Sequence, residues 1–258
     1  MKASEATETA PGVPQGSTRQ RVLLINVLVV AVCALVYELL CGTLASYLLG
    51  DAVLQFSLVL GTYLFAMGVG AWLSKSLEER AASRYVQAEL ALALVGGLSV
   101  PLLLAGVAAH VPLRPALHAL VFVVGALVGV ELPLLVKILR EPPGVGPAEP
   151  KTQSDLRERV PHESRGQTFG ELVARAFAYD YVGALAASLL FPLLLVPRLG
   201  LVRTSVVTGA VNAVVALSAT FVVRVERPAI VRTVGVLVLA VLAVTFVRGE
   251  AWVAGATD

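Results

Sequence analysis

One long apolar run near the amino end of the chain reads VLLINVLVVAVCALVYELLCGTLASYLL, residues 22–49. Its single charged side chain is Glu38. A helix needs about 20 apolar residues to cross the hydrocarbon core of a bilayer, so this run is long enough to cross one. Because the run is also too long for the core of a signal peptide, we interpret it as an uncleaved first membrane span.

The composition of the whole chain supports the same interpretation. Of its 258 residues, 57% are hydrophobic and only 15% are charged, and the mean hydropathy is +0.82. A soluble domain of this size cannot bury so much apolar surface. Lipid offers the backbone no hydrogen-bond partners, and runs of this length satisfy the backbone as helices. We therefore predict an all-α fold, a polytopic transmembrane helical bundle surrounded by the lipid bilayer.

Apolar runs bounded by charged or turn residues predict about seven spans, at 22–49, 53–73, 85–109, 115–137, 178–197, 203–223 and 229–247. The chain then divides into four parts. These are a disordered cytoplasmic tail (1–21), a first membrane bundle of four helices (22–139), a cytoplasmic loop with a short amphipathic helix (140–177), and a second membrane bundle of three helices (178–248).

The distribution of basic residues predicts the orientation of these spans. With the amino terminus in the cytoplasm, sixteen of the twenty Lys and Arg residues fall in cytoplasmic segments, and the other four are Arg114, Arg198, Arg203 and Arg248. Basic residues are retained on the cytoplasmic side, so we expect a multi-pass protein of the cell (inner) membrane with its amino terminus inside. A net charge of +2 gives no support to nucleic-acid binding.

Two carboxylates stand out within apolar runs, Glu38 and Asp180. A charge in a span costs on the order of 2.5–3.5 kcal/mol on insertion scales, so such acids usually face protein or a wet cavity. Both lie on helix faces of small residues and beside tyrosines, Tyr37 and Tyr181. Small residues permit close helix approach, so we expect both acids to be buried against neighbouring helices. They differ in depth, with Glu38 near mid-membrane and Asp180 near the cytoplasmic end of its span.

A third acid, Glu131, lies near a Gly125–Gly129 pair and Pro133, on a bulkier helix face. Gln55 lies at helical spacing on the second span and is able to line the same interior. A buried carboxylate needs a positive partner or a proton, and no Lys or Arg at mid-span supplies that charge. The candidate site for an organic cation or a proton therefore comprises Glu38, Asp180, Glu131, Tyr37, Tyr181 and Gln55. The alternative, that the acids only fix helix packing, stays open.

Motifs for catalysis and cofactor binding are missing from the sequence. It contains no G-x-x-x-x-G-K-[ST], H-E-x-x-H or G-x-S-x-G pattern. Cys33 and Cys41 would lie about 12 Å apart along one helix, too far for a disulfide, and they have no partners for a metal site. His110 and His118 lack a third ligand. We expect no catalytic residues, no cofactor and no metal.

Three segments carry a resemblance to a known family: YELLCGTLASYLLGDAVLQFSLVLGTYLFAMGVGAWLS (37–74), GVELPLL (129–135) and DYVGALAASLLFPLLLVPRLGL (180–201). Together they resemble the amino-terminal transmembrane domain of membrane-bound spermidine synthase-like proteins, the polyamine aminopropyltransferase family, over roughly residues 22–247. In longer members this domain precedes a soluble synthase domain with a Rossmann-like fold, which binds decarboxylated S-adenosylmethionine and a diamine. That domain's glycine-rich acidic motif and catalytic aspartate have no counterpart here.

Together with the buried acids, the resemblance leads to two expected functions and two alternatives. The chain is expected to be a polyamine or small-cation binding or transport module, or a membrane partner of a separate soluble aminopropyltransferase, and in either case not itself an enzyme. The alternatives are a structural membrane anchor or assembly protein without a ligand, and a fragment of a membrane-bound spermidine synthase.

Overall fold

A computed structural model describes residues 15–140 and 169–255, and these residues form helices and short connections without strands. The all-α prediction is confirmed for this part of the chain. The helices are α1 (Gln15–Leu49), α2 (Ala52–Leu73), a 3-10 segment (Ser74–Arg80), α3 (Ala81–Gly97), α4 (Ser99–Ala108), α5 (Leu113–Arg140), α6 (Phe169–Leu190), a π-helical segment (Phe191–Leu195), α7 (Val196–Val222) and α8 (Pro228–Gly255).

Five helical stretches of the described residues are long and apolar enough to cross a membrane. They are Thr18–Leu49, Ala52–Gly97, Leu113–Arg140, Gly170–Val222 and Pro228–Arg248. Two of them contain more than one helix, because α2 continues through the 3-10 segment into α3, and α6 continues through the π-helical segment into α7. The count of seven crossings and their direction remain predictions.

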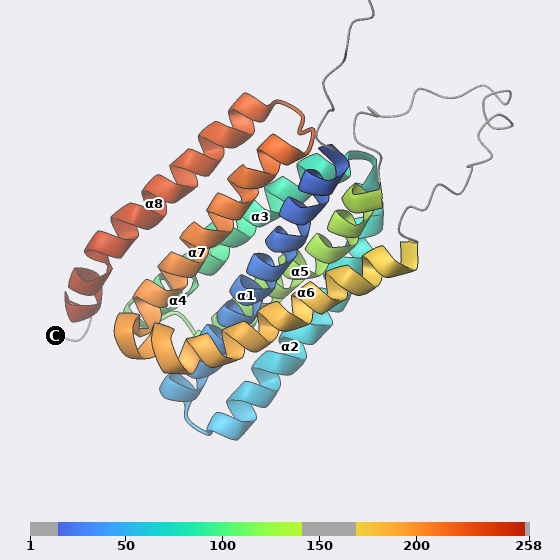
Figure 1. Ribbon diagram of the computed structural model, residues 1–258. Coiled ribbons are helices and arrows are strands. Elements are labelled where there is room, and N and C mark those ends of the chain that lie inside the picture. The colour runs from blue at the N-terminus through green and yellow to red at the C-terminus, as the bar shows by residue number, and fades with distance from the viewer. Residues whose placement is uncertain (1–14, 141–168, 256–258) are drawn as a thin grey trace, which may run out of the picture.

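The helices pack as one bundle with α1 near its middle (Figure 1). Helix α1 contacts α2, α5, α6 and α7, and α7 also packs against α3 and α8. The predicted division into bundles of four and three helices remains a prediction, and helices of both parts contact one another. Glycines at the helix contacts allow this close packing. Gly183 of α6 lies against the backbone carbonyl of Leu28, and Gly209 of α7 lies against that of Ala93, so neither position has room for a Cβ atom.

Helix breaks follow from proline and glycine positions. The predicted span 85–109 is divided at Leu98 into α3 and α4, because Pro101 lacks the N–H that would bond the carbonyl of Gly97. The chain reverses again after α6, through the π-helical segment and Gly200, which has a φ of 71°. Figure 1 shows α6 and α7 running in opposite directions on either side of this corner.

Helices α1 and α6 both begin earlier in the sequence than the predicted spans do. Helix α1 begins at Gln15, so residues 15–21 are helical rather than part of a disordered tail, while residues 1–14 lie outside the described residues. Arg19 helps to explain the extension, because its Nη2 donates to the carbonyl oxygen of Ile138 on α5 over 2.8 Å. The predicted amphipathic helix is continuous with α6 from Phe169, and residues 141–168 of the loop are not described.

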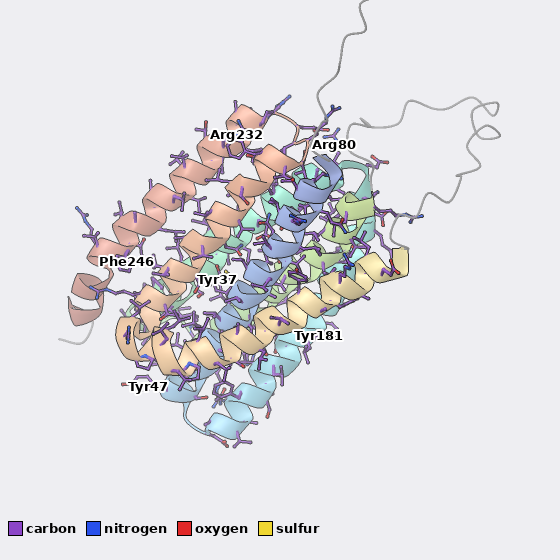
Figure 2. All side chains as sticks on the ribbon, in the orientation of Figure 1. Tyr37, Tyr47, Arg80, Tyr181, Arg232 and Phe246 are labelled. Atoms are coloured by element: carbon purple, nitrogen blue, oxygen red, sulfur yellow. The ribbon has the colours of Figure 1, made fainter. Side chains whose placement is uncertain are left out.

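Among the described residues, the start of α1, the 3-10 segment, the end of α5 and the α7–α8 connection lie together at one end of the bundle, which we call the basic end. Its contacts join the start of α1 to the end of α5 through Arg19, and the 3-10 segment to the α7–α8 connection through an Arg80–Glu226 ion pair of 3.3 Å. Figure 2 shows Arg80 and Arg232 at this end, and Tyr47 and Phe246 at the opposite end.

Candidate functional site

Tyr63 of α2 lies within electrostatic reach of the three acids predicted from the sequence. It is 4% exposed, and its hydroxyl donates to the backbone carbonyl of Ala34 on α1 over 3.2 Å. Its side chain is close enough to interact electrostatically with Glu38, Glu131 and Asp180. These acids come from three different helices, α1, α5 and α6.

Glu38 and Asp180 are both half-buried, at the edges of packed helix faces. The small face of α1 that was predicted around Glu38 is buried, including Ala34 and Ala45. The matching face of α6 is buried at Ala176, Gly183 and Ala187, where it packs on α1. The small residues therefore act as predicted, and they leave the two carboxyls at the margin of the α1–α6 contact.

Glu131 is more deeply buried than the sequence led us to expect. Its residue is only 3% exposed, and neither carboxyl oxygen has a hydrogen-bond partner within the described residues. The position is fixed by close packing of α5 on α2, where Gly129 lies directly against the backbone carbonyl of Met67. Glu131 is also close enough to interact with Asp180 and with a fourth acid, Glu89. Glu131 therefore interacts electrostatically both with an acid near Tyr63 and with an acid in the interior of the bundle.

Glu89 of α3 is a site residue that sequence reasoning missed. It is 0% exposed, and Nδ2 of Asn212 on α7 donates to its Oε2 over 2.8 Å and to its backbone carbonyl over 3.1 Å. The hydroxyl of Tyr85 lies beside the same carboxyl. We call Glu89 and Glu131 the buried acid pair, and these two together with Glu38 and Asp180 the acid cluster.

Signals for the buried acid pair were present in the sequence. Glu89 lies only four residues inside the predicted span 85–109, a position that by itself indicates a residue near the membrane surface and not a buried acid. Asn212 is the polar residue in the middle of the run GAVNAVVAL, and an uncharged amide in a span commonly binds a polar group on another helix. Pairing the two required the register of α3 against α7, which hydropathy does not contain.

The three other predicted residues occupy different positions. Tyr37 is 0% exposed, packs its ring on Gly96 of α3, and is close enough to interact with Glu89 and Glu131. It lies near the middle of the bundle (Figure 2). Tyr181 is 69% exposed on the outer face of α6, so it does not join the cluster, because it lies one residue beyond the face that carries Asp180.

Gln55 is buried but lies apart from the acids. It belongs to the first turn of α2, eight residues before Tyr63, which is about 12 Å along a helix axis. Nothing in the described residues brings its side chain to the acid cluster.

Two pockets of the described residues are apolar. One, of about 260 Å³, is lined by Leu102, Leu103, Gly106, Val111, Leu113, Ala116 and Leu120 of α4, α5 and their connection. The other lies along α2 beside Phe65 and Trp72. Neither includes a residue of the acid cluster. The cluster is thus a set of packed side chains with unpartnered polar atoms. Within the described chain, no three His, Cys, Asp or Glu residues are grouped closely enough to hold a metal ion.

Comparison with known proteins finds similar sequences of one kind. The chain is 43% identical over 229 residues to a polyamine aminopropyltransferase of Leptospira interrogans, a match that covers 88% of this chain and 41% of that protein. It is 44% identical over 207 residues to polyamine aminopropyltransferase 1 of Ralstonia nicotianae, covering 79% of this chain and 35% of that protein.

A relative from Streptomyces coelicolor, also named polyamine aminopropyltransferase 1, is 39% identical over 233 residues, covering 88% of this chain and 40% of the relative. No family model and no solved structure matches the chain. The chain thus spans about two fifths of the length of these curated relatives. Over most of its own length, the chain is homologous to the polyamine aminopropyltransferase, or spermidine synthase-like, family.

Proposed function

We propose that this chain is a membrane domain of the polyamine aminopropyltransferase type and that its acid cluster binds a polyamine or a similar organic cation. The observation that carries the proposal is that Glu38, Glu131 and Asp180, from three different helices, all lie within electrostatic reach of Tyr63. Carboxyls in the interior of a membrane domain are costly, and they commonly mark the path or the binding site of a cation.

The chemistry of a polyamine suits this arrangement. A polyamine is a flexible chain of ammonium groups separated by short methylene segments. Half-buried carboxyls such as Glu38 and Asp180 supply separated negative charges, and an aromatic ring such as that of Tyr63 supplies an apolar surface with a negative face. The relatives are themselves named for polyamines, which favours this cation over others.

Equilibrium binding of radiolabelled spermidine to the protein in lipid nanodiscs tests the proposal. The variants Glu38→Gln and Asp180→Asn are each expected to weaken binding on the order of tenfold, since each removes one charge from the site. Glu79→Gln, which changes an exposed acid of the 3-10 segment, is the matched control and should bind as the parent protein does. If both site variants fold normally and bind spermidine with unchanged affinity, the proposed site is wrong.

Uptake of spermidine into vesicles that contain the same variants separates binding from transport. A transport module loses uptake in Glu38→Gln and Asp180→Asn, and a module that only binds shows no uptake above empty vesicles in the parent protein.

A second function, anchoring of an aminopropyltransferase at the membrane, is favoured by the relatives' lengths, because most of each relative extends beyond the matched region. An anchor needs none of the acids for its role. In that case Glu38→Gln and Asp180→Asn alter stability and leave the amount of membrane-bound synthase activity per folded protein unchanged.

A further inference from the structure

The buried acid pair lies among polar atoms that have no partners. Within the described residues, the atoms that are both buried and without a hydrogen bond include both carboxyl oxygens of Glu131, Oδ1 of Asn212 and the hydroxyl of Tyr37. Unpaired buried polar groups cost on the order of 1–3 kcal/mol each, so a fold rarely keeps several of them together without a ligand or proton to satisfy them.

The carboxyls of Glu89 and Glu131 differ in the hydrogen bonds that would stabilise their ionised forms. Oε2 of Glu89 accepts from the amide of Asn212 over 2.8 Å, and a donated hydrogen bond stabilises an ionised carboxylate. Glu131 receives no hydrogen bond from the described residues, and it lies within electrostatic reach of Glu89 and Asp180. Like charges in a desolvated site disfavour each other, so Glu89 and Glu131 resist being ionised together.

The titratable groups that face the pair from each neighbouring helix are all neutral or acidic. They are Cys33 and Tyr37 from α1, Tyr63 from α2, Tyr85 from α3 and Asp180 from α6, while α7 contributes the uncharged Asn212. No ion pair given for the described part of the chain joins a Lys or Arg to Glu89 or Glu131. A proton is therefore the positive charge that this interior is built to accept.

We propose that Glu131 carries a proton in the cation-free protein, held there by the Glu89 carboxylate and its Asn212 partner, and that it releases this proton when a cation enters among Glu38, Asp180 and Tyr63. This inference rests on the proposed function for its second half. Glu131 is the link, because it interacts with Glu89 on one side and with Asp180 and Tyr63 on the other. An arriving ammonium group favours the ionised form of Glu131, so its O–H bond breaks and the proton passes to solvent. Cation binding and proton release then depend on each other.

Infrared spectroscopy of the protein in lipid nanodiscs tests the first half without any polyamine. The parent protein at neutral pH should show the carbonyl stretching band of a protonated carboxylic acid, and Glu131→Gln should lack it. In Glu89→Gln the band should disappear at a lower pH than in the parent, because the neighbouring negative charge is gone. Glu79→Gln is the control and should leave the band unchanged. A parent protein without the band, or a band that persists in folded Glu131→Gln, overturns the inference.

Addition of spermidine to the same samples tests the second half. Saturating spermidine should remove most of the band in the parent protein. If spermidine binds and the band is unchanged, the linkage is wrong although the proposed cation site stands. If spermidine does not bind at all, the proposed function and the linkage both fail, and the band alone decides whether Glu131 holds a proton.

Discussion

The side-chain amide of Asn212 donates to a carboxylate oxygen of Glu89 over 2.8 Å, joining α7 to α3 at a position where both residues are fully buried. The same amide nitrogen also donates to the backbone carbonyl of Glu89 over 3.1 Å. This contact crosses the predicted boundary between two bundles, and it places an acid that had no evident partner in the sequence at the centre of the fold.

Loss of the Asn212 amide should destabilise the protein. Asn212→Leu leaves the Glu89 carboxyl without its donor, and a buried polar group that loses its partner costs on the order of 1–3 kcal/mol. Unfolding of the detergent-solubilised protein by denaturant measures the change. Replacing both partners, in Glu89→Leu with Asn212→Leu, should restore much of the lost stability, since no unpaired group then remains. If the double variant lost as much unfolding free energy as the two single variants lose together, this account would be contradicted.

Close packing of α2 on α5 should depend on Gly129. A Cβ atom at this position overlaps the backbone carbonyl of Met67, so Gly129→Ala should lower the free energy of unfolding by about 1–3 kcal/mol. Gly61 of α2 is the matched control, because no atom lies within 4 Å of a Cβ built there. Thermal unfolding of both variants distinguishes them, and equal stability of Gly129→Ala and Gly61→Ala would show that the helices are not packed this closely.

At the basic end, the ion pair and the neighbouring hydrogen bond should contribute unequally. The Arg80–Glu226 pair has side chains that are 61% and 56% exposed, so Arg80→Ala should change stability by less than about 1 kcal/mol. Ser83 is buried, and its hydroxyl accepts from the backbone N–H of Glu226 over 2.8 Å. Ser83→Ala should therefore cost about 1 kcal/mol or more. Denaturant unfolding at two salt concentrations checks both, because salt screens the ion pair of the parent protein and should therefore shrink the stability difference caused by Arg80→Ala only.

The predicted orientation is open to a labelling experiment. Ser76 lies in the 3-10 segment at the basic end, and Ala52 begins α2 at the opposite end; both are exposed. If the basic end is cytoplasmic, a membrane-impermeant maleimide added to intact bacterial cells should label Ala52→Cys and spare Ser76→Cys. The native Cys33 and Cys41 are buried and should give little background. The reverse labelling pattern would show that the orientation is inverted.

Hydropathy along the sequence predicted where many of the helices lie, but not how they pack. Apolar run length located α2, α5 and the start of α8 to within a few residues, because these runs are bounded by charges or turns, whereas α8 continues to Gly255, past the predicted end at 247. It did not divide α3 from α4, since Leu98 and its neighbours are as apolar as the helices themselves. It also did not reveal that α6 and α7 pack on α1 and α3, because that contact depends on the shapes of small residues on facing helices.

The candidate site was predicted in part. Glu38, Glu131 and Asp180 were identified as acids in apolar runs, and each lies within electrostatic reach of Tyr63. Tyr181 was included because of its sequence neighbour Asp180, but adjacent residues on a helix point about 100° apart, and its ring faces outward. Glu89 was missed because a position near the predicted end of a span conceals how deeply the neighbouring helices bury it.

The affinity of Glu131→Gln for spermidine tests the central claim most directly, because Glu131 is the acid that interacts both with Glu89 and with Asp180 and Tyr63. Glutamine keeps the size of the side chain and removes its capacity to ionise. In lipid nanodiscs we predict that the dissociation constant rises on the order of tenfold while the protein stays folded. A folded Glu131→Gln protein whose dissociation constant equals that of the parent would contradict the account.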